Sequence, residues 1–100
     1  MEWRWTYSCL FKFTFNNHQI SEITITDHYQ LNHPEITNNL ILELLVNLSG
    51  QRMRPRKNYD KRDVYVWEWT ADENKEYRLI FWFKDQQTNH LWIRNCYPID

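Results

Sequence analysis

Residues 37–50 of this 100-residue chain read TNNLILELLVNLSG, and this stretch predicts the main helix. Its leucines and isoleucine recur at helical spacing and form one apolar stripe, made of Leu40, Ile41, Leu44, Leu45 and Leu48. Thr37 suits the N-cap position, because its hydroxyl can accept a hydrogen bond from an amide of the first turn. At the other end, Ser49 precedes Gly50, the only glycine of the chain, which favours the left-handed backbone that ends many helices. We therefore expect a helix near residues 38–49.

Residues 3–15 alternate between apolar and polar side chains, which is the period of a β-strand. One face of this strand would carry Trp3, Trp5, Tyr7, Cys9, Phe11, Phe13 and Phe15. Isoleucines and threonines at residues 20–26 indicate a second, shorter strand that can fold back as a hairpin. Asparagine tolerates positive φ, so we expect turns at Asn16-Asn17 and at residues 72–74.

Three further segments are dense in aromatic and β-branched residues, at residues 64–70, 76–84 and 90–97. Short polar loops join them, and consecutive strands of this kind pair as an antiparallel meander. Residues 27–30 have the pattern of a capping box and predict a short helical turn before Pro34. The fold class that follows is α+β, with a mostly antiparallel, aromatic-rich sheet packed on one main amphipathic helix.

Length and composition predict a single domain over residues 1–100. The chain is 42% hydrophobic and 17% aromatic, which is enough apolar surface to offset the entropy of ordering. The first residues lack a basic region followed by an apolar core, and no apolar run approaches the roughly 20 residues that cross a bilayer. We therefore expect a cytoplasmic protein without a membrane partner.

The two cysteines, Cys9 and Cys96, lie near opposite ends of the sequence and within predicted strands. Reduced, buried thiols are the expected state, and a disulfide or a reactive thiol is the alternative. The sequence has no CxxC pair, no Cys/His cluster with zinc spacing and no EF-hand loop. No metal and no cofactor is predicted.

The net charge of −1 argues against a generic nucleic-acid coat, but the charge is unevenly distributed. The chain sums to −3 up to Gln51 and to +2 from Arg52 onward. Residues 51–63 read as a linker that holds half of the basic residues, Arg52, Arg54, Arg56, Lys57, Lys61 and Arg62. Such a linker can neutralise the phosphates of RNA. The alternative is a solvated loop whose charges only keep the protein in solution.

Two arginines, Arg78 and Arg94, lie in the middle of hydrophobic segments. A guanidinium within a strand has to emerge on a wet face, where two of them would suit a phosphate. A cross-strand salt bridge from Arg78 to Glu68 or Glu76 is the alternative. Tyr97 ends the last segment and can stack on a base, supply a proton or pack under the sheet.

Two histidines, His28 and His33, flank the entry to the main helix. Histidine titrates near neutral pH, so the pair can act as general base and acid, or can instead cap the helix. The tryptophans at 67, 69, 82 and 92 raise a similar choice. Exposed beside arginines they would form a base-stacking surface, and otherwise they fill the core.

The second half of the chain resembles RelE/ParE-type toxins, which belong to the barnase–EndoU–colicin–RelE group of ribonucleases. The resemblance covers roughly residues 27–98. It rests on a helix ending in Leu-Ser-Gly, a basic linker, the strand Tyr77-Arg78-Leu79-Ile80-Phe81, and Leu91-Trp92-Ile93-Arg94 ending in Tyr97. Residues 1–26 depart from the family, whose members usually begin with one short strand.

The resemblance implies a small, metal-independent endoribonuclease that cleaves RNA by attack of the 2′-hydroxyl, neutralised by an antitoxin partner. Carried over by position, Arg78 looks like the strand arginine of the family and Arg94 like its later cation. Tyr97 resembles the C-terminal aromatic residue, and His28 or His33 the histidine at the helix entry. The alternative is a non-catalytic protein-interaction module that uses the aromatic strand and the basic linker as an interface.

Overall fold

The computed structural model describes residues 3–9, 11–27, 33–70 and 75–99. A six-stranded sheet has the order β1-β4-β8-β7-β6-β5. Its strands are β1 (Arg4–Ser8), β4 (Glu22–Thr26), β5 (Lys57–Tyr59), β6 (Arg62–Thr70), β7 (Glu76–Phe83) and β8 (His90–Ile99). A two-stranded ribbon of β2 (Thr14–Phe15) and β3 (His18–Gln19), the helix α2 (Asn38–Leu48) and a short 3-10 turn, η2 (Lys84–Gln86), complete the described elements. The α+β class is confirmed.

The predicted helix is confirmed together with both of its ends. The Thr37 hydroxyl accepts a hydrogen bond from the Leu40 amide at 3.1 Å, and Gly50 takes up a φ of 89° after the last turn. Four members of the predicted stripe are buried, Ile41, Leu44, Leu45 and Leu48, whereas Leu40 is only partly buried against the core. This stripe packs against the buried residues of the sheet in one core. No helix that the structure describes is long and apolar enough to cross a membrane.

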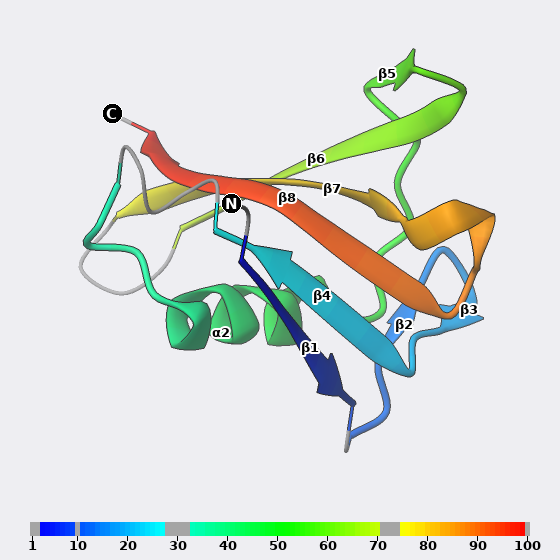
Figure 1. Ribbon diagram of the computed structural model, residues 1–100, viewed down its shortest axis with the longest axis horizontal. Coiled ribbons are helices and arrows are strands. Elements are labelled where there is room, and N and C mark those ends of the chain that lie inside the picture. The colour runs from blue at the N-terminus through cyan, green and yellow to red at the C-terminus, as the bar shows by residue number, and fades with distance from the viewer. Residues whose placement is uncertain (1–2, 10, 28–32, 71–74, 100) are drawn as a thin grey trace.

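The predicted meander of β6, β7 and β8 is also confirmed, and each of its pairs is antiparallel. The sheet as a whole is mixed, because β4 joins β8 in parallel with Ile25 opposite Ile93. In the sheet, β8 therefore lies between the strands of the first half of the chain, β1 and β4, and those of the second half, β7, β6 and β5. Figure 1 shows α2 on one side of the sheet, with β1 and β5 at opposite edges.

The single strand predicted over residues 3–15 is wrong in its extent. β1 ends at Ser8 and pairs antiparallel with β4, while the chain between them leaves the sheet and forms β2 and β3. Phe15 lies in the core, with its ring centroid 5.1 Å from that of Tyr65 and 5.2 Å from that of Phe81. The chain therefore crosses the helix-side face of the sheet toward β6 and β7. The expected turn is present, with Asn16 at a φ of 51° and Asn17 at 67°.

The prediction of a linker over residues 51–63 is also wrong, because this segment contains β5 and the first residues of β6. β5 pairs with β6 through a turn in which Asp60 and Lys61 both have positive φ. Every residue of β5 is exposed, so the hairpin carries no apolar alternation that a sequence pattern would reveal. The predicted capping box at residues 27–30 lies outside the described residues except for Asp27, and the predicted turn at residues 72–74 lies outside them entirely.

Candidate nucleic-acid interface

The sheet has a second face, opposite α2, which we call the open face. On β7, Leu79 and Phe81 are buried in the core, so Arg78, Ile80 and Trp82 lie on the open face. On β8 the corresponding residues are Trp92, Arg94, Asn95 and Tyr97, since Leu91, Ile93 and Cys96 are buried. On β6 the residues on this face include Arg62 and Glu68.

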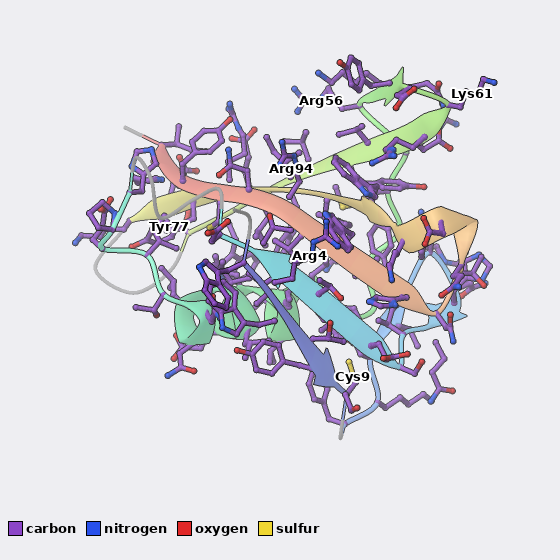
Figure 2. The ribbon with its side chains drawn as sticks, viewed as in Figure 1. Arg4, Cys9, Arg56, Lys61, Tyr77 and Arg94 are labelled. Carbon is purple, nitrogen blue, oxygen red and sulfur yellow. The ribbon has the colours of Figure 1, made fainter. Side chains whose placement is uncertain are left out.

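An irregularity in β8 brings Arg94 to this face. Ile80 is opposite Asn95 whereas its neighbour Phe81 is opposite Ile93, so Arg94 is the extra residue of a β-bulge. Arg94 and Asn95 consequently both project away from the core. Figure 2 shows Arg94 on the side of β8 away from α2. The two strand arginines thus share one face, as the sequence predicted.

Arg78 is held by two neighbours on the open face. Its Nη1 donates to the Tyr97 hydroxyl at 3.1 Å, and its Nη2 donates to Glu68 Oε1 at 3.3 Å. The salt bridge that was the alternative to a phosphate site is therefore present with Glu68, which is directly opposite Arg78 in the register. The hydrogen bond to Tyr97, together with the charge of Glu68, raises the pKa of Arg78, although desolvation acts in the other direction. Its Nε is buried and has no acceptor within the described part of the chain.

His33 extends this cluster from the helix entry. Its ring stacks on that of Tyr97, with centroids 6.2 Å apart and planes inclined by 24°. Its Nδ1 lies 3.5 Å from Glu35 Oε1. Three of the predicted site residues, Arg78, Tyr97 and His33, are thus in a continuous chain of contacts. His28 lies outside the described residues.

At the other end of the open face, two tryptophans stand side by side under basic side chains. Trp82 of β7 is directly opposite Trp92 of β8. The Arg62 guanidinium lies 4.6 Å from the centre of the Trp82 ring. Arg4 lies 5.1 Å and Lys84 Nζ 5.9 Å from that of Trp92. All three distances are within the range of cation–π attraction.

The four tryptophans singled out in the sequence lie on both faces of the sheet. Trp67 packs against the core on the helix side, and Trp69 stacks on it at 5.3 Å while remaining 37% exposed. Core filling therefore describes Trp67, whereas Trp82 and Trp92 belong to the open face. Sequence reasoning did not single out Arg4 or Lys84, because nothing in the sequence shows that β1 and β8 both pair with β4.

A hollow of about 950 Å³ opens above Trp82 and Trp92. Its basic lining residues are Arg4, Lys61, Arg62 and Lys84, and its acidic ones are Asp60, Asp63 and Asp85. The hairpin of β5 and β6 forms one wall, and the turn after β7 forms another. The volume is in the range of sites that hold small ligands.

Threonines form the floor of the open face beside Trp92. Thr24 is buried, and its hydroxyl lies 2.9 Å from that of Thr6 and 2.7 Å from His90 Nε2. Burial lowers the pKa of His90, which keeps its ring neutral at pH 7. This polar cluster holds β1, β4 and β8 together beneath Arg4.

The six basic residues of the predicted RNA-binding linker do not act as one group. Arg56 lies 4.0 Å from Glu68, Lys57 lies over Tyr59, and Lys61 and Arg62 line the hollow. Figure 2 shows Arg56 and Lys61 beside β5. The other two, Arg52 and Arg54, border a separate hollow next to the Asn16-Asn17 turn, where Arg52 donates to Asn17 at 3.0 Å.

A second surface lies on the helix side of the molecule, between β1 and α2. A groove of about 460 Å³ there is lined largely by apolar side chains, among them Tyr7, Cys9, Phe11, Leu42 and Val46. Phe11 is 46% exposed and Val46 55%. Cys9 and Cys96 are both unpaired thiols, and burial raises the pKa of Cys96 to about 12. Within the described residues, no group of three or more His, Cys, Asp or Glu side chains could hold a metal ion.

Comparison with family models, with curated proteins and with solved structures gives no match for this chain. Any functional conclusion consequently rests on the residues and contacts of the molecule itself.

Proposed function

We propose that this protein is a small, metal-independent endoribonuclease that cleaves RNA on the open face of its sheet. The observation that supports this most directly is the contact chain from His33 through Tyr97 to Arg78. Its three members are the group types that RNA cleavage by a 2′-hydroxyl requires, namely a base, an acid and a cation. The toxin-type role, with an antitoxin partner, belongs to the same proposal.

In this proposal the 2′-oxygen of the substrate attacks the adjacent phosphorus while His33 accepts the hydroxyl proton. Arg78 stabilises the added negative charge on the phosphorane oxygens. The bond from phosphorus to the 5′-oxygen then breaks, and Tyr97 donates its proton to that oxygen. The products are a 2′,3′-cyclic phosphate and a free 5′-hydroxyl. Proton return from His33 to Tyr97 through solvent completes the cycle.

Neighbouring charges support binding of the substrate. Arg94 lies on the same face as Arg78, close along the strand to Tyr97. Arg56 bridges toward the same face through Glu68. Glu68 holds the guanidinium of Arg78 in place, and in this role it positions the cation.

The clean test uses Tyr97→Phe and His33→Gln, because removing Arg78 would also release Glu68. Cleavage of a fluorescent RNA should fall by about 100-fold or more in each variant, the usual contribution of general acid or base catalysis. Tyr59→Phe and His18→Gln are matched controls, since both residues are exposed and lie outside the contact chain. The RNA should be cut in the presence of EDTA, and a 2′-O-methyl RNA should resist.

Two results would contradict the proposal. One is cleavage by Tyr97→Phe and His33→Gln at the rate of their controls. The other is a product with a 3′-hydroxyl, which arises from attack by water and needs no 2′-hydroxyl.

The apolar groove between β1 and α2 favours a second candidate, a protein-interaction module. Exposed apolar side chains such as Phe11 and Val46 beside an edge strand are typical of a protein-binding surface. Expression of the chain alone separates the two candidates. Growth arrest with RNA degradation, preserved in Phe11→Ser and Val46→Ser, supports the enzyme. Growth arrest that leaves RNA intact and disappears in these two variants supports the protein-interaction module.

A further inference from the structure

We infer that the hollow above Trp82 and Trp92 is a subsite that binds the unpaired bases of a single-stranded nucleic acid. The inference names RNA as the ligand on the strength of the proposed function, but the site is distinct from the contact chain around Arg78. Trp82 and Arg78 lie on the same face of β7, four residues apart, which is about 13 Å along a strand. One bound strand can therefore reach both.

The tryptophans provide flat apolar surface at the floor of the hollow. They are cross-strand neighbours, and both are only half-buried although each is among the largest side chains. The matching residues on the helix side, Phe83 and Leu91, already contribute to the core. Packing of the core therefore does not explain why indoles occupy these two positions.

The guanidinium groups above the indoles extend this surface. Arg62 lies over Trp82 and Arg4 over Trp92 at cation–π distance. A planar guanidinium held on an aromatic ring can carry a base on its outer side, and guanidinium N–H groups are good donors to phosphate oxygens. Bases can therefore stack without displacing the arginines.

The charges of the hollow point to bases as the main attraction. Its four basic and three acidic side chains nearly cancel, and Asp63 accepts a hydrogen bond from Asn58 at 3.0 Å. A site built only to neutralise phosphates would have few carboxylates. A site that stacks bases tolerates them, because aspartate can accept hydrogen bonds from base amino groups. Duplex RNA keeps its bases stacked inside and cannot use such a surface.

The test measures binding of a 2′-O-methyl oligonucleotide, which the proposed reaction cannot cleave, by fluorescence anisotropy. The single strand should bind at least ten-fold more tightly than the same sequence as a duplex. Trp82→Leu and Trp92→Leu should each weaken binding by about 5- to 150-fold, the range for one lost base stack. Trp69→Leu is the matched control, because Trp69 is a partly exposed tryptophan on the helix side. Trp82→Phe should retain part of the affinity and guards against a folding defect.

Arg62→Lys separates stacking from charge, since lysine keeps the charge and loses the plane. Loss of affinity in this variant supports the stack. The inference is overturned if Trp82→Leu and Trp92→Leu bind as Trp69→Leu does, if the duplex binds equally well, or if heparin or an acidic peptide binds in its place with the same dependence on Trp82. Failure of the proposed cleavage would look different, with tight, tryptophan-dependent binding and no cut RNA.

Discussion

Replacing Leu45 by alanine should lower the stability of this protein severely. Leu45 is fully buried and lies at the centre of the apolar stripe of α2. The substitution removes three carbon atoms from the core, which at about 0.8 kcal/mol for each buried CH₂ amounts to about 2.4 kcal/mol. The cavity left behind raises the cost, and Leu→Ala changes in cores range over about 2–5 kcal/mol.

Val46 provides the matched control on the same helix. It is the next residue along the chain, but it is 55% exposed. Val46→Ala should change the free energy of unfolding by less than about 0.5 kcal/mol, because it removes little buried surface. The comparison isolates burial from any general effect of alanine on the helix.

Urea unfolding followed by circular dichroism measures both variants. Leu45→Ala should also lower the Tm by about 10–20 °C, since about 1 kcal/mol corresponds to 4–8 °C in a domain of this size. If this variant is already unfolded, Leu45→Met keeps the volume and should cost less than about 1.5 kcal/mol. A loss below about 0.5 kcal/mol in Leu45→Ala, equal to that in Val46→Ala, would refute the packing of α2 against the sheet.

Three further predictions concern charge and titration. Lys61→Ala should weaken RNA binding and reduce the slope of log affinity against log salt concentration by about 0.7, which corresponds to the loss of one phosphate contact. Lys12→Ala, the control, should leave this slope unchanged. The free energy of unfolding should fall as the pH drops below 6.5. Burial lowers the pKa of His90 in the folded protein, so the unfolded chain binds a proton there more readily than the folded one. Urea unfolding of His90→Gln over the same pH range should show a smaller fall. In native protein at pH 8, iodoacetamide should modify Cys9 well before Cys96, whose thiol has a pKa of about 12, and equal rates by mass spectrometry would contradict the burial of Cys96.

The local elements could be predicted from the sequence because their signals are local. The stripe of α2, its Thr37 cap and the Gly50 terminus depend on residues within a few turns of one another. The same holds for the three strands of the meander and for the Asn16-Asn17 turn. Each pattern was sufficient because the buried face and the backbone geometry agreed.

One failure comes from packing between segments that are distant in the sequence. The alternation over residues 3–15 does not show whether the chain continues as one strand of the sheet or crosses the face of the sheet. The chain crosses the face, because Phe15 is buried against Tyr65. A second failure is local: the hairpin of β5 and β6 was missed because β5 is fully exposed and shows no apolar alternation.

The site was predictable in its residue types and less so in its geometry. Arg78 and Arg94 stood out as charges within apolar strands, but their common face depends on the bulge in β8. The approach of Arg4 to Trp92 could not be foreseen, because it depends on β4 lying between β1 and β8.

The position of β8 at the centre of the sheet has a consequence for folding during translation. β4 and β7 both pair with β8, which follows every other described strand in the chain. On the ribosome, the antiparallel pair of β1 and β4 and the hairpin of β6 and β7 can therefore form early, but no strand pairing joins them until β8 emerges. Both strand pairs expose an unpaired edge during this interval, and exposed strand edges favour aggregation. Tyr97 arrives on the same strand, so the contact with Arg78 cannot exist until synthesis has passed β8. In the proposed function, RNA cleavage could therefore begin only after β8 has been synthesised.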